Sequence, residues 1–145
     1  MAEQASERAV MHAPPDKCFE VVADFERYTE WAADIKAVTI EQRDEEGRPS
    51  EVAFRAAAFG RSTSYTLRFD YGKAPKELSW VQTRGDLTSR LDGTYVFDAT
   101  DNGDTEVTYH LTVELRVPIP GFVKRRAEGK IIGTALDELK KRVEG

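Results

Sequence analysis

The end of the chain, residues 118–145, constrains the fold more than any other stretch. Pro118 and Pro120 end the extended segment before it, and after them only two glycines oppose a helix. The pattern therefore predicts one long helix over residues 122–144. Residues spaced three and four apart form one largely apolar stripe along this helix: Phe122, Gly129, Ile132, Leu136, Leu139 and Val143. A helix with one apolar face needs a partner, so the rest of the chain must supply an apolar surface.

Two glycines, Gly129 and Gly133, lie one turn apart on or beside this stripe. Each costs about 0.5–1 kcal/mol of helix stability relative to alanine. The favoured explanation is a close approach of the helix backbone to a sheet or to another helix. The alternative is a void beneath the helix that leaves room for a ligand. Arg125 projects from the same side of the helix, and there the favoured explanation is a side chain that reaches water.

Length and composition limit the classes of protein to which the chain can belong. The 145 residues suit one domain, residues 1–145, and acidic residues outnumber basic ones by 26 to 21, which argues against nucleic-acid binding. Cys18 is the only cysteine, so no intramolecular disulfide and no thiolate cluster for zinc is possible, and its context predicts a buried side chain. No metal or cofactor is expected. Without a leader or an apolar run of about 20 residues, the chain is expected to be soluble and cytoplasmic.

The first part of the chain combines one strand with two short helices. Residues 4–13 suit a strand, which two prolines end. A helix follows, because proline at the first helical position and Asp16 in the first turn both favour one. Asp24 can cap a second short helix that runs to Trp31, with aromatic residues at every third position.

Beyond Asp34, turn-forming segments divide the chain into six strands. The turns fall at residues 44–49, 59–61, 72–76, 85–86 and 101–104. Short connections make neighbouring strands antiparallel. The first strand and these six are therefore expected to form a seven-stranded antiparallel meander whose single apolar face is covered by the terminal helix. This arrangement belongs to the α+β class.

Alternation along the strands separates the face toward the helix from the face toward solvent. The inward set is mainly aromatic and aliphatic, and Gly93 within it suggests a bulge or a strong bend. Because the strand before residue 59 adds mostly small side chains, an under-filled space with aromatic walls is expected. The strand positions predicted to bind a ligand there are Phe54, Tyr65, Leu67, Phe69, Trp80, Gln82, Arg84, Ser89, Leu91, Tyr95 and Tyr109. The helix positions are Phe122, Arg125, Gly129, Ile132, Gly133 and Leu136.

Three segments of the sequence carry more specific information than the general pattern of strands, turns and helices. They are Asp24-Phe-Glu-Arg-Tyr-Thr-Glu-Trp31, Leu91-Asp-Gly-Thr-Tyr-Val-Phe97, and Pro118-Ile-Pro-Gly-Phe-Val-Lys-Arg-Arg126 opening a helix that ends in Ala135-Leu-Asp-Glu-Leu-Lys-Lys-Arg142. With them the chain resembles the polyketide cyclase/dehydrase and lipid-transport family, of the START-like, birch-pollen-allergen-like superfamily, and is similar to its coenzyme Q-binding branch. The resemblance implies a helix-grip fold, in which a curved sheet holds the long helix over a cavity. Members range from lipid carriers to aromatase/cyclases and stress-response proteins, and no catalytic residue is carried over by motif.

The residues favour binding over catalysis. No nucleophile elbow, His-Glu-x-x-His helix, phosphate-cradling loop or dinucleotide fingerprint occurs, and His12 and His110 fall at surface positions. The first hypothesis is a protein that binds or carries a hydrophobic small molecule, such as a lipid, quinone or polyketide-like compound, in the internal cavity. The alternative is a polyketide cyclase or dehydratase, in which Arg84 or Arg125 polarises a carbonyl and a tyrosine hydroxyl relays a proton.

An apolar loop with a basic end precedes the terminal helix. Two prolines rigidify the loop that starts at Val117, and Lys124, Arg125 and Arg126 follow it in a chain that is otherwise acidic. This segment is a candidate for peripheral contact with an anionic membrane. The simpler explanation is that its cations pair with Glu128 or with neighbouring loops. Cations at the amino terminus of a helix oppose the helix dipole, so helix stability does not explain their position.

Overall fold

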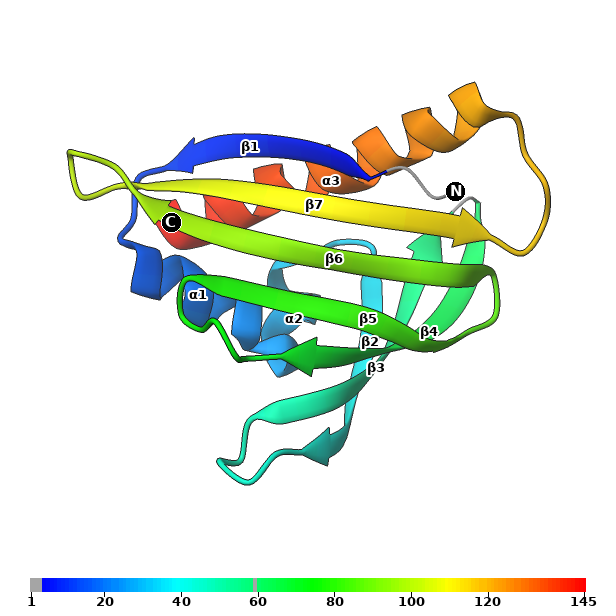
Figure 1. Cartoon of the computed structure of the whole chain (residues 1–145), viewed down its shortest axis with the longest axis horizontal. Helices are drawn as coiled ribbons and strands as arrows, with labels where there is room; N and C mark the ends of the chain where they lie inside the picture. The colour runs from blue at the N-terminus through cyan, green and yellow to red at the C-terminus, as the bar shows by residue number, and fades with distance from the viewer. Residues whose placement is uncertain (1–3, 59) are drawn as a thin grey trace.

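The computed structural model describes residues 4–58 and 60–145 (Figure 1). In chain order its elements are β1 (Ala5–Met11), α1 (Pro15–Ala23), a 3-10 turn (Phe25–Arg27), α2 (Tyr28–Trp31), β2 (Ile35–Arg43), β3 (Pro49–Ala58), β4 (Arg61–Asp70), β5 (Glu77–Gly85), β6 (Thr88–Ala99), β7 (Thr105–Leu115) and α3 (Gly121–Glu144). The expected α+β class and element order are confirmed, and the strands end within a residue or two of the predicted turns. The predicted turn at residues 59–61 includes Phe59, which lies outside the described residues.

The seven strands form one antiparallel sheet in the order β1-β7-β6-β5-β4-β3-β2. The prediction of one seven-stranded meander is confirmed for β2 to β7 and is wrong for β1. β1 lies beside β7, at the opposite edge from β2, because the connection between β1 and β2 contains α1 and α2 and crosses the sheet. Figure 1 shows that the sheet curves, so that β2, β3 and β4 run across the direction of β6 and β7, with the helices on one side of it.

α3 packs on the sheet over fewer turns than its sequence suggested. Ile132 and Val143 are buried, but Phe122 is 61% exposed, because the first turns of α3 extend past β1 (Figure 1). The buried stripe begins instead at Glu128, which is 2% exposed. Its Oε2 atom accepts a hydrogen bond from the backbone N–H of Val113 at 3.3 Å. This bond holds the amino-terminal half of α3 to β7.

Neither Gly129 nor Gly133 of α3 lies against another backbone. A Cβ atom at Gly129 would meet only the Oε2 atom of Glu7, at 4.0 Å, and a Cβ atom at Gly133 would meet nothing within 4 Å. Close packing was the favoured explanation for these glycines, and it is wrong. Glu7 belongs to β1, so Gly129 lies on the side of α3 that faces the β1 edge of the sheet.

A β-bulge in β5 reverses the expected alternation near the β5–β6 turn. Thr66 pairs with Arg84 and Leu67 pairs with Gln82, so Thr83 is an extra residue without a partner on β4. Arg84 therefore shares the outer face with Thr66, and its predicted inward direction is wrong. A shift of one residue moves a side chain to the opposite face of a sheet, and strict alternation in a sequence does not reveal where such a shift occurs.

A second bulge, in β6, has the same effect on the other strand of this turn. Thr88 pairs with Leu115 and Arg90 pairs with Glu114, so Ser89 is the extra residue. Thr88 then takes the inward direction that the sequence assigned to Ser89. Thr88 is 5% exposed, whereas Ser89 lies on the surface.

Gly93 marks a close approach and not a bulge. It pairs in register with Trp80 on β5 and with Leu111 on β7. A Cβ atom at Gly93 would lie 2.4 Å from the Cζ2 atom of Trp80 and 2.8 Å from the backbone carbonyl oxygen of His110. The missing side chain makes room for the indole ring of Trp80, and the bulge that the sequence suggested at Gly93 does not occur.

Gly93→Ala is expected to lower the free energy of unfolding by about 1–3 kcal/mol, because the new methyl group must displace the indole ring or a strand backbone. Urea unfolding followed by circular dichroism measures the change. In a Trp80→Leu background the same substitution is expected to cost less, since the nearer of the two overlaps is with the indole ring. An unchanged free energy of unfolding in Gly93→Ala would contradict this role of Gly93.

Candidate functional site

The concave face of the sheet, α2 and α3 surround a cavity of about 200 Å³. Aromatic side chains form much of its wall: Tyr28, Trp31, Phe54, Tyr65, Phe69, Trp80, Tyr95 and Tyr109. Smaller apolar residues complete it: Ala32, Ile35, Ala56, Ala57, Leu67, Leu91, Val113, Ile131 and Ala135. The polar lining residues are Asp34, Thr63, Thr88, Thr134 and Glu138. No lysine, arginine or histidine is among the described residues of the lining.

Pairing of neighbouring strands brings the aromatic residues of the wall together. Phe54 and Tyr65 are partners across β3 and β4, and their rings stack with centroids 5.5 Å apart. Tyr95 and Tyr109 are partners across β6 and β7, with centroids 4.5 Å apart. Trp80 packs edge-on against Tyr109 at 5.7 Å. Each such pair contributes about 0.5–1.5 kcal/mol beyond the area it buries, so the aromatic wall is held in place without a ligand.

Three tyrosine hydroxyls in this wall have no hydrogen-bond partner among the described residues, those of Tyr65, Tyr95 and Tyr109. The fourth tyrosine of the wall, Tyr28, donates its hydroxyl to the backbone carbonyl of Val22, and Tyr71, which lies outside the lining, donates its hydroxyl to that of Pro49. Burial raises the pKa of the three unpaired phenols well above the usual tyrosine value. They therefore stay protonated at neutral pH and can donate hydrogen bonds.

The indole N–H of Trp31 is also unpaired. Its Nε1 atom is buried and meets no acceptor among the described residues. A buried donor without an acceptor costs roughly 1–3 kcal/mol, and such groups are rare in native proteins. Trp31 and the three phenols thus place hydrogen-bond donors in the wall of a mostly apolar cavity. An acceptor atom on a bound molecule would satisfy them.

Two carboxylates, Asp34 and Glu138, bring negative charge to the cavity. Asp34 is exposed, directly before β2. Glu138 accepts a hydrogen bond from the backbone N–H of Ala33 at 3.0 Å, which ties α3 to the end of α2. An ion pair of Arg142 with Glu30, at 2.8 Å, joins the same two helices. Since no cation of the described residues lines the cavity, these carboxylates oppose the entry of an anion.

Eight of the residues predicted from the strands line the cavity: Phe54, Tyr65, Leu67, Phe69, Trp80, Leu91, Tyr95 and Tyr109. All eight are apolar or aromatic and lie on β3 to β7. At these positions the alternation of inward and outward side chains matches the sequence. The structure thus brings the predicted aromatic set together around one space.

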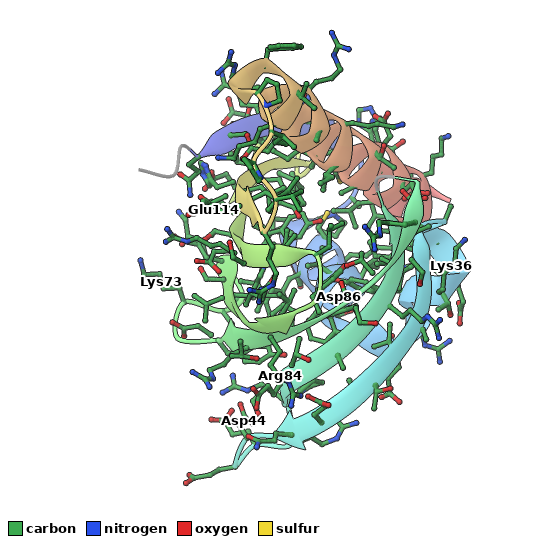
Figure 2. The ribbon with its side chains drawn as sticks, turned by 90° about the vertical axis from the view of Figure 1, so that its right-hand side faces the viewer. Lys36, Asp44, Lys73, Arg84, Asp86 and Glu114 are labelled. Carbon is green, nitrogen blue, oxygen red and sulfur yellow. The ribbon has the colours of Figure 1, made fainter. Side chains whose placement is uncertain are left out.

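The three polar strand residues of the prediction do not line the cavity. The Gln82 amide donates from Nε2 to the backbone carbonyl of Thr88 at 2.9 Å, and Ser89 is exposed at its bulge. Arg84 lies on the outer face, where its Nη2 atom is 2.6 Å from Oε1 of Glu41. Figure 2 shows Arg84 in the lower part of the sheet, whereas α3 runs along the top. Arg84 therefore does not reach a ligand in the cavity.

None of the residues predicted from the terminal helix lines the cavity. Phe122 and Arg125 are exposed on the first turns of α3. Ile132 and Leu136 are buried in the core and do not face the cavity. Gly129 and Gly133 also lie outside the lining, so these two glycines do not create the ligand space.

From α3 the cavity is lined instead by Ile131, Thr134, Ala135 and Glu138. These residues lie about 100° around the helix axis from the buried stripe, since each residue advances a helix by that angle. The apolar pair Ile131 and Ala135, four residues apart, was the signal for this second face. Tyr28 and Trp31 were recognised in the sequence as aromatic residues on one side of a helix, but they were not assigned to the cavity.

Other candidate chemistry is not supported by the described residues. They contain no group of three or more His, Cys, Asp and Glu side chains placed to hold a metal ion. In the same part of the chain, no helix is long and apolar enough to cross a membrane. Cys18 is buried, as its sequence context predicted, and burial raises the pKa of its thiol.

Several solved structures share this fold. A START superfamily protein from Mycobacterium smegmatis is 24% identical, with a TM-score of 0.93 over 97% of both chains. The Zhui aromatase/cyclase from Streptomyces sp. R1128 is 15% identical, with a TM-score of 0.84 over 99% of this chain and 94% of that one. The protein Ara h 8.0201 is 16% identical, with a TM-score of 0.73 over 99% and 98% of the two chains. The expected helix-grip fold is confirmed.

The family is shown by the sequence itself. No curated protein matches the chain. A family model, described as polyketide cyclase / dehydrase and lipid transport, matches residues 11–140. The match runs from the end of β1 into the last turns of α3, and so includes every element that lines the cavity. The chain therefore belongs to the polyketide cyclase/dehydrase and lipid transport family.

Proposed function

We propose that the protein binds an uncharged, hydrophobic small molecule that carries acceptor oxygens, such as a quinone or the ring system of a polyketide. The observation that carries this proposal is a set of donors in an aromatic wall that have no hydrogen-bond partner among the described residues: the hydroxyls of Tyr65, Tyr95 and Tyr109 and the buried indole N–H of Trp31. A carbonyl oxygen of a ligand would accept hydrogen bonds from these donors, while the aromatic walls bury its rings.

The volume and the charge of the cavity narrow the ligand class. An apolar cavity of about 150 Å³ holds one benzene molecule, so a cavity of about 200 Å³ suits one ring or two fused rings. A long acyl or isoprenoid chain needs more room than this. Asp34 and Glu138, without a cation among the described lining residues, disfavour a carboxylate ligand. A quinone or polyketide ring fits the volume and carries no negative charge, whereas a free fatty acid is too long and carries a carboxylate.

A panel of three two-ring compounds tests the proposal. 1,4-Naphthoquinone carries acceptor oxygens without charge, naphthalene carries none, and 2-naphthoate carries a negative charge. Both tryptophans of the chain, Trp31 and Trp80, line the cavity, so their fluorescence reports binding, with isothermal calorimetry as the independent measure. We expect the quinone to bind most tightly. Failure of all three to bind, or a preference for the naphthoate, would contradict the proposal.

Removing the donors is expected to weaken quinone binding selectively. Tyr95→Phe/Tyr109→Phe should raise the Kd for 1,4-naphthoquinone about tenfold, since each net hydrogen bond contributes about 0.5–1.5 kcal/mol, and should leave the Kd for naphthalene unchanged. Tyr71→Phe is the matched control, because its hydroxyl donates to Pro49 at 2.7 Å and lies outside the cavity lining. An equal loss for both ligands would indicate damaged packing and no hydrogen bond to the quinone.

The second candidate function is a polyketide cyclase or dehydratase acting in the same cavity. Family membership and the unpaired phenols favour it, because a phenol can donate to a developing enolate. Arg84 and Arg125, which the sequence suggested for polarising a carbonyl, take no part in this mechanism, since neither lines the cavity. Turnover of a poly-β-ketone mimic that is lost in Tyr95→Phe and retained in Arg84→Ala would support this enzymatic function. Absence of turnover by the wild-type protein would contradict it and leave ligand binding as the only proposed function.

A further inference from the structure

We infer that the loop between β7 and α3, together with the first turns of α3, docks on an anionic lipid bilayer. This segment, residues 117–126, is called the tip below. It projects past the start of β1 at one end of the molecule (Figure 1). The inference does not depend on the proposed ligand, because it rests on the surface of the tip and not on the cavity.

The tip gathers exposed apolar side chains. Val117 is 54% exposed, Phe122 is 61% exposed and Val123 is 39% exposed. Elsewhere in the described chain, the large exposed apolar residues are Val10 and Val81, on two different strands. Scattered single residues of that kind need no explanation, but three within one turn and its preceding loop mark an interaction surface.

The same segment carries positive charge that no described residue neutralises in an ion pair. Lys124, Arg125 and Arg126 follow the apolar residues, and none of them forms an ion pair with a described residue. Pairing with Glu128, the simpler explanation of these cations, is not found: that carboxylate is buried and bonds to the backbone of Val113. The first turn of α3 also has no acidic residue and no side-chain cap. Helix stability therefore does not account for the cations, because they oppose the dipole.

An anionic bilayer fits these features better than a protein partner does. A stable protein interface takes about 800 Å² from each partner, which three side chains on a projecting tip do not supply. A bilayer accepts a small apolar wedge in its headgroup region and attracts the neighbouring cations. The whole chain has a formal charge of −5, so the rest of the surface is repelled and the tip is oriented toward the lipid.

No residue of the tip lines the cavity, but the chain on both sides of the tip does. Val113 on β7 precedes the tip, Ile131 on α3 follows it, and both of these residues line the cavity. A protein docked through the tip would hold this side of the cavity close to the bilayer. Docking would thus bring the cavity close to the membrane, and a hydrophobic ligand could pass between the bilayer and the cavity.

Sedimentation with vesicles tests the inference. Vesicles of phosphatidylcholine alone are compared with vesicles that also contain phosphatidylserine, at low and high salt. The wild-type protein is expected to bind the anionic vesicles at low salt and to be released at high salt. Lys124→Gln/Arg126→Gln should weaken binding about 25-fold, which corresponds to about 1 kcal/mol for each cation. Phe122→Ser should weaken it about tenfold.

Matched controls carry the same chemical changes far from the tip. Lys17→Gln/Lys73→Gln removes two exposed cations on α1 and on the β4–β5 connection, at the opposite end of the molecule in Figure 1. Val81→Ser removes an exposed valine of β5. Both controls should bind as the wild type does, and Ala135→Phe, which fills the cavity, should still bind vesicles. No binding to anionic vesicles at low salt, or equal losses in tip and control variants, would overturn the inference.

Discussion

Ala135→Phe is expected to abolish binding of 1,4-naphthoquinone while the protein stays folded. Ala135 lines the cavity from α3, and a cavity of about 150 Å³ is enough for a single benzene ring. A benzyl group at this position would therefore occupy most of the cavity of about 200 Å³. We expect the Kd to rise at least about a hundredfold, a change of about 2.7 kcal/mol. Isothermal calorimetry measures the Kd, and urea unfolding shows that the overpacking cost stays within about 1–3 kcal/mol.

Gly133→Leu is the matched control for this variant. It adds a large side chain to the same helix, but a Cβ atom at Gly133 meets nothing within 4 Å and the residue lies outside the lining. Quinone binding should be unchanged, and the free energy of unfolding should rise by up to about 1 kcal/mol as the helix loses a glycine. Loss of binding in Gly133→Leu with unchanged binding in Ala135→Phe would instead place the ligand beneath the glycines, as the sequence alone allowed.

The folded state is expected to lose stability steeply above about pH 10. Burial raises the pKa of Tyr28, Tyr65, Tyr95 and Tyr109 well above the usual value near 10, and raises that of Tyr71 to about 12. In the unfolded chain these phenols ionise near pH 10, whereas in the folded protein they keep their protons. The folded state therefore binds more protons in this range, and its stability is complete below pH 10 and falls as the pH rises.

The size of this effect is large compared with the stability of a small domain. Each buried phenol lowers the free energy of unfolding by about 1.4 kcal/mol per pH unit, so the four in the cavity wall lower it by about 5 kcal/mol per unit. A typical domain has about 5–15 kcal/mol in total, so unfolding within a few pH units of pH 10 is expected. Urea unfolding at a series of pH values measures the slope.

A single substitution gives the check on this prediction. Tyr109→Phe should reduce the slope by about a fifth, because one of the five phenols with raised pKa values is removed. Absorbance of the phenolate follows ionisation directly and should rise together with unfolding. Stability that is independent of pH through this range, or phenolate that forms while the protein remains folded, would show that the cavity is more hydrated than its lining indicates.

The fold of this protein was predictable because its signals are local. Prolines before α1 and α3, turn-forming residues between strands and the spacing of apolar residues each act over a few neighbouring positions. The pairing of β1 with β7 was not predictable in this way. It depends on a connection with two helices that crosses the sheet, and no local pattern records where such a connection ends.

The aromatic wall was predictable for the same reason, since alternation on β4, β6 and β7 alone puts Tyr65, Tyr95 and Tyr109 on the inner face. The polar residues were not. The bulges at Thr83 and Ser89 arise where neighbouring strands adjust their pairing near the β5–β6 turn, and they turn Arg84 outward and Thr88 inward. Strict alternation therefore assigned the wrong polar residues to the cavity.

The sequence by itself determined the order of the elements, the inner aromatic residues and the basic apolar tip, because each depends on residues close together in the chain. The tertiary structure alone decided which face of α3 meets the cavity. Ile132 with Leu136 and Ile131 with Ala135 are both apolar pairs, and only the placement of the helix over the curved sheet distinguishes them. It also decided that the buried indole N–H of Trp31 meets no acceptor among the described residues, because an unpaired donor is a property of everything that surrounds it and not of the residue.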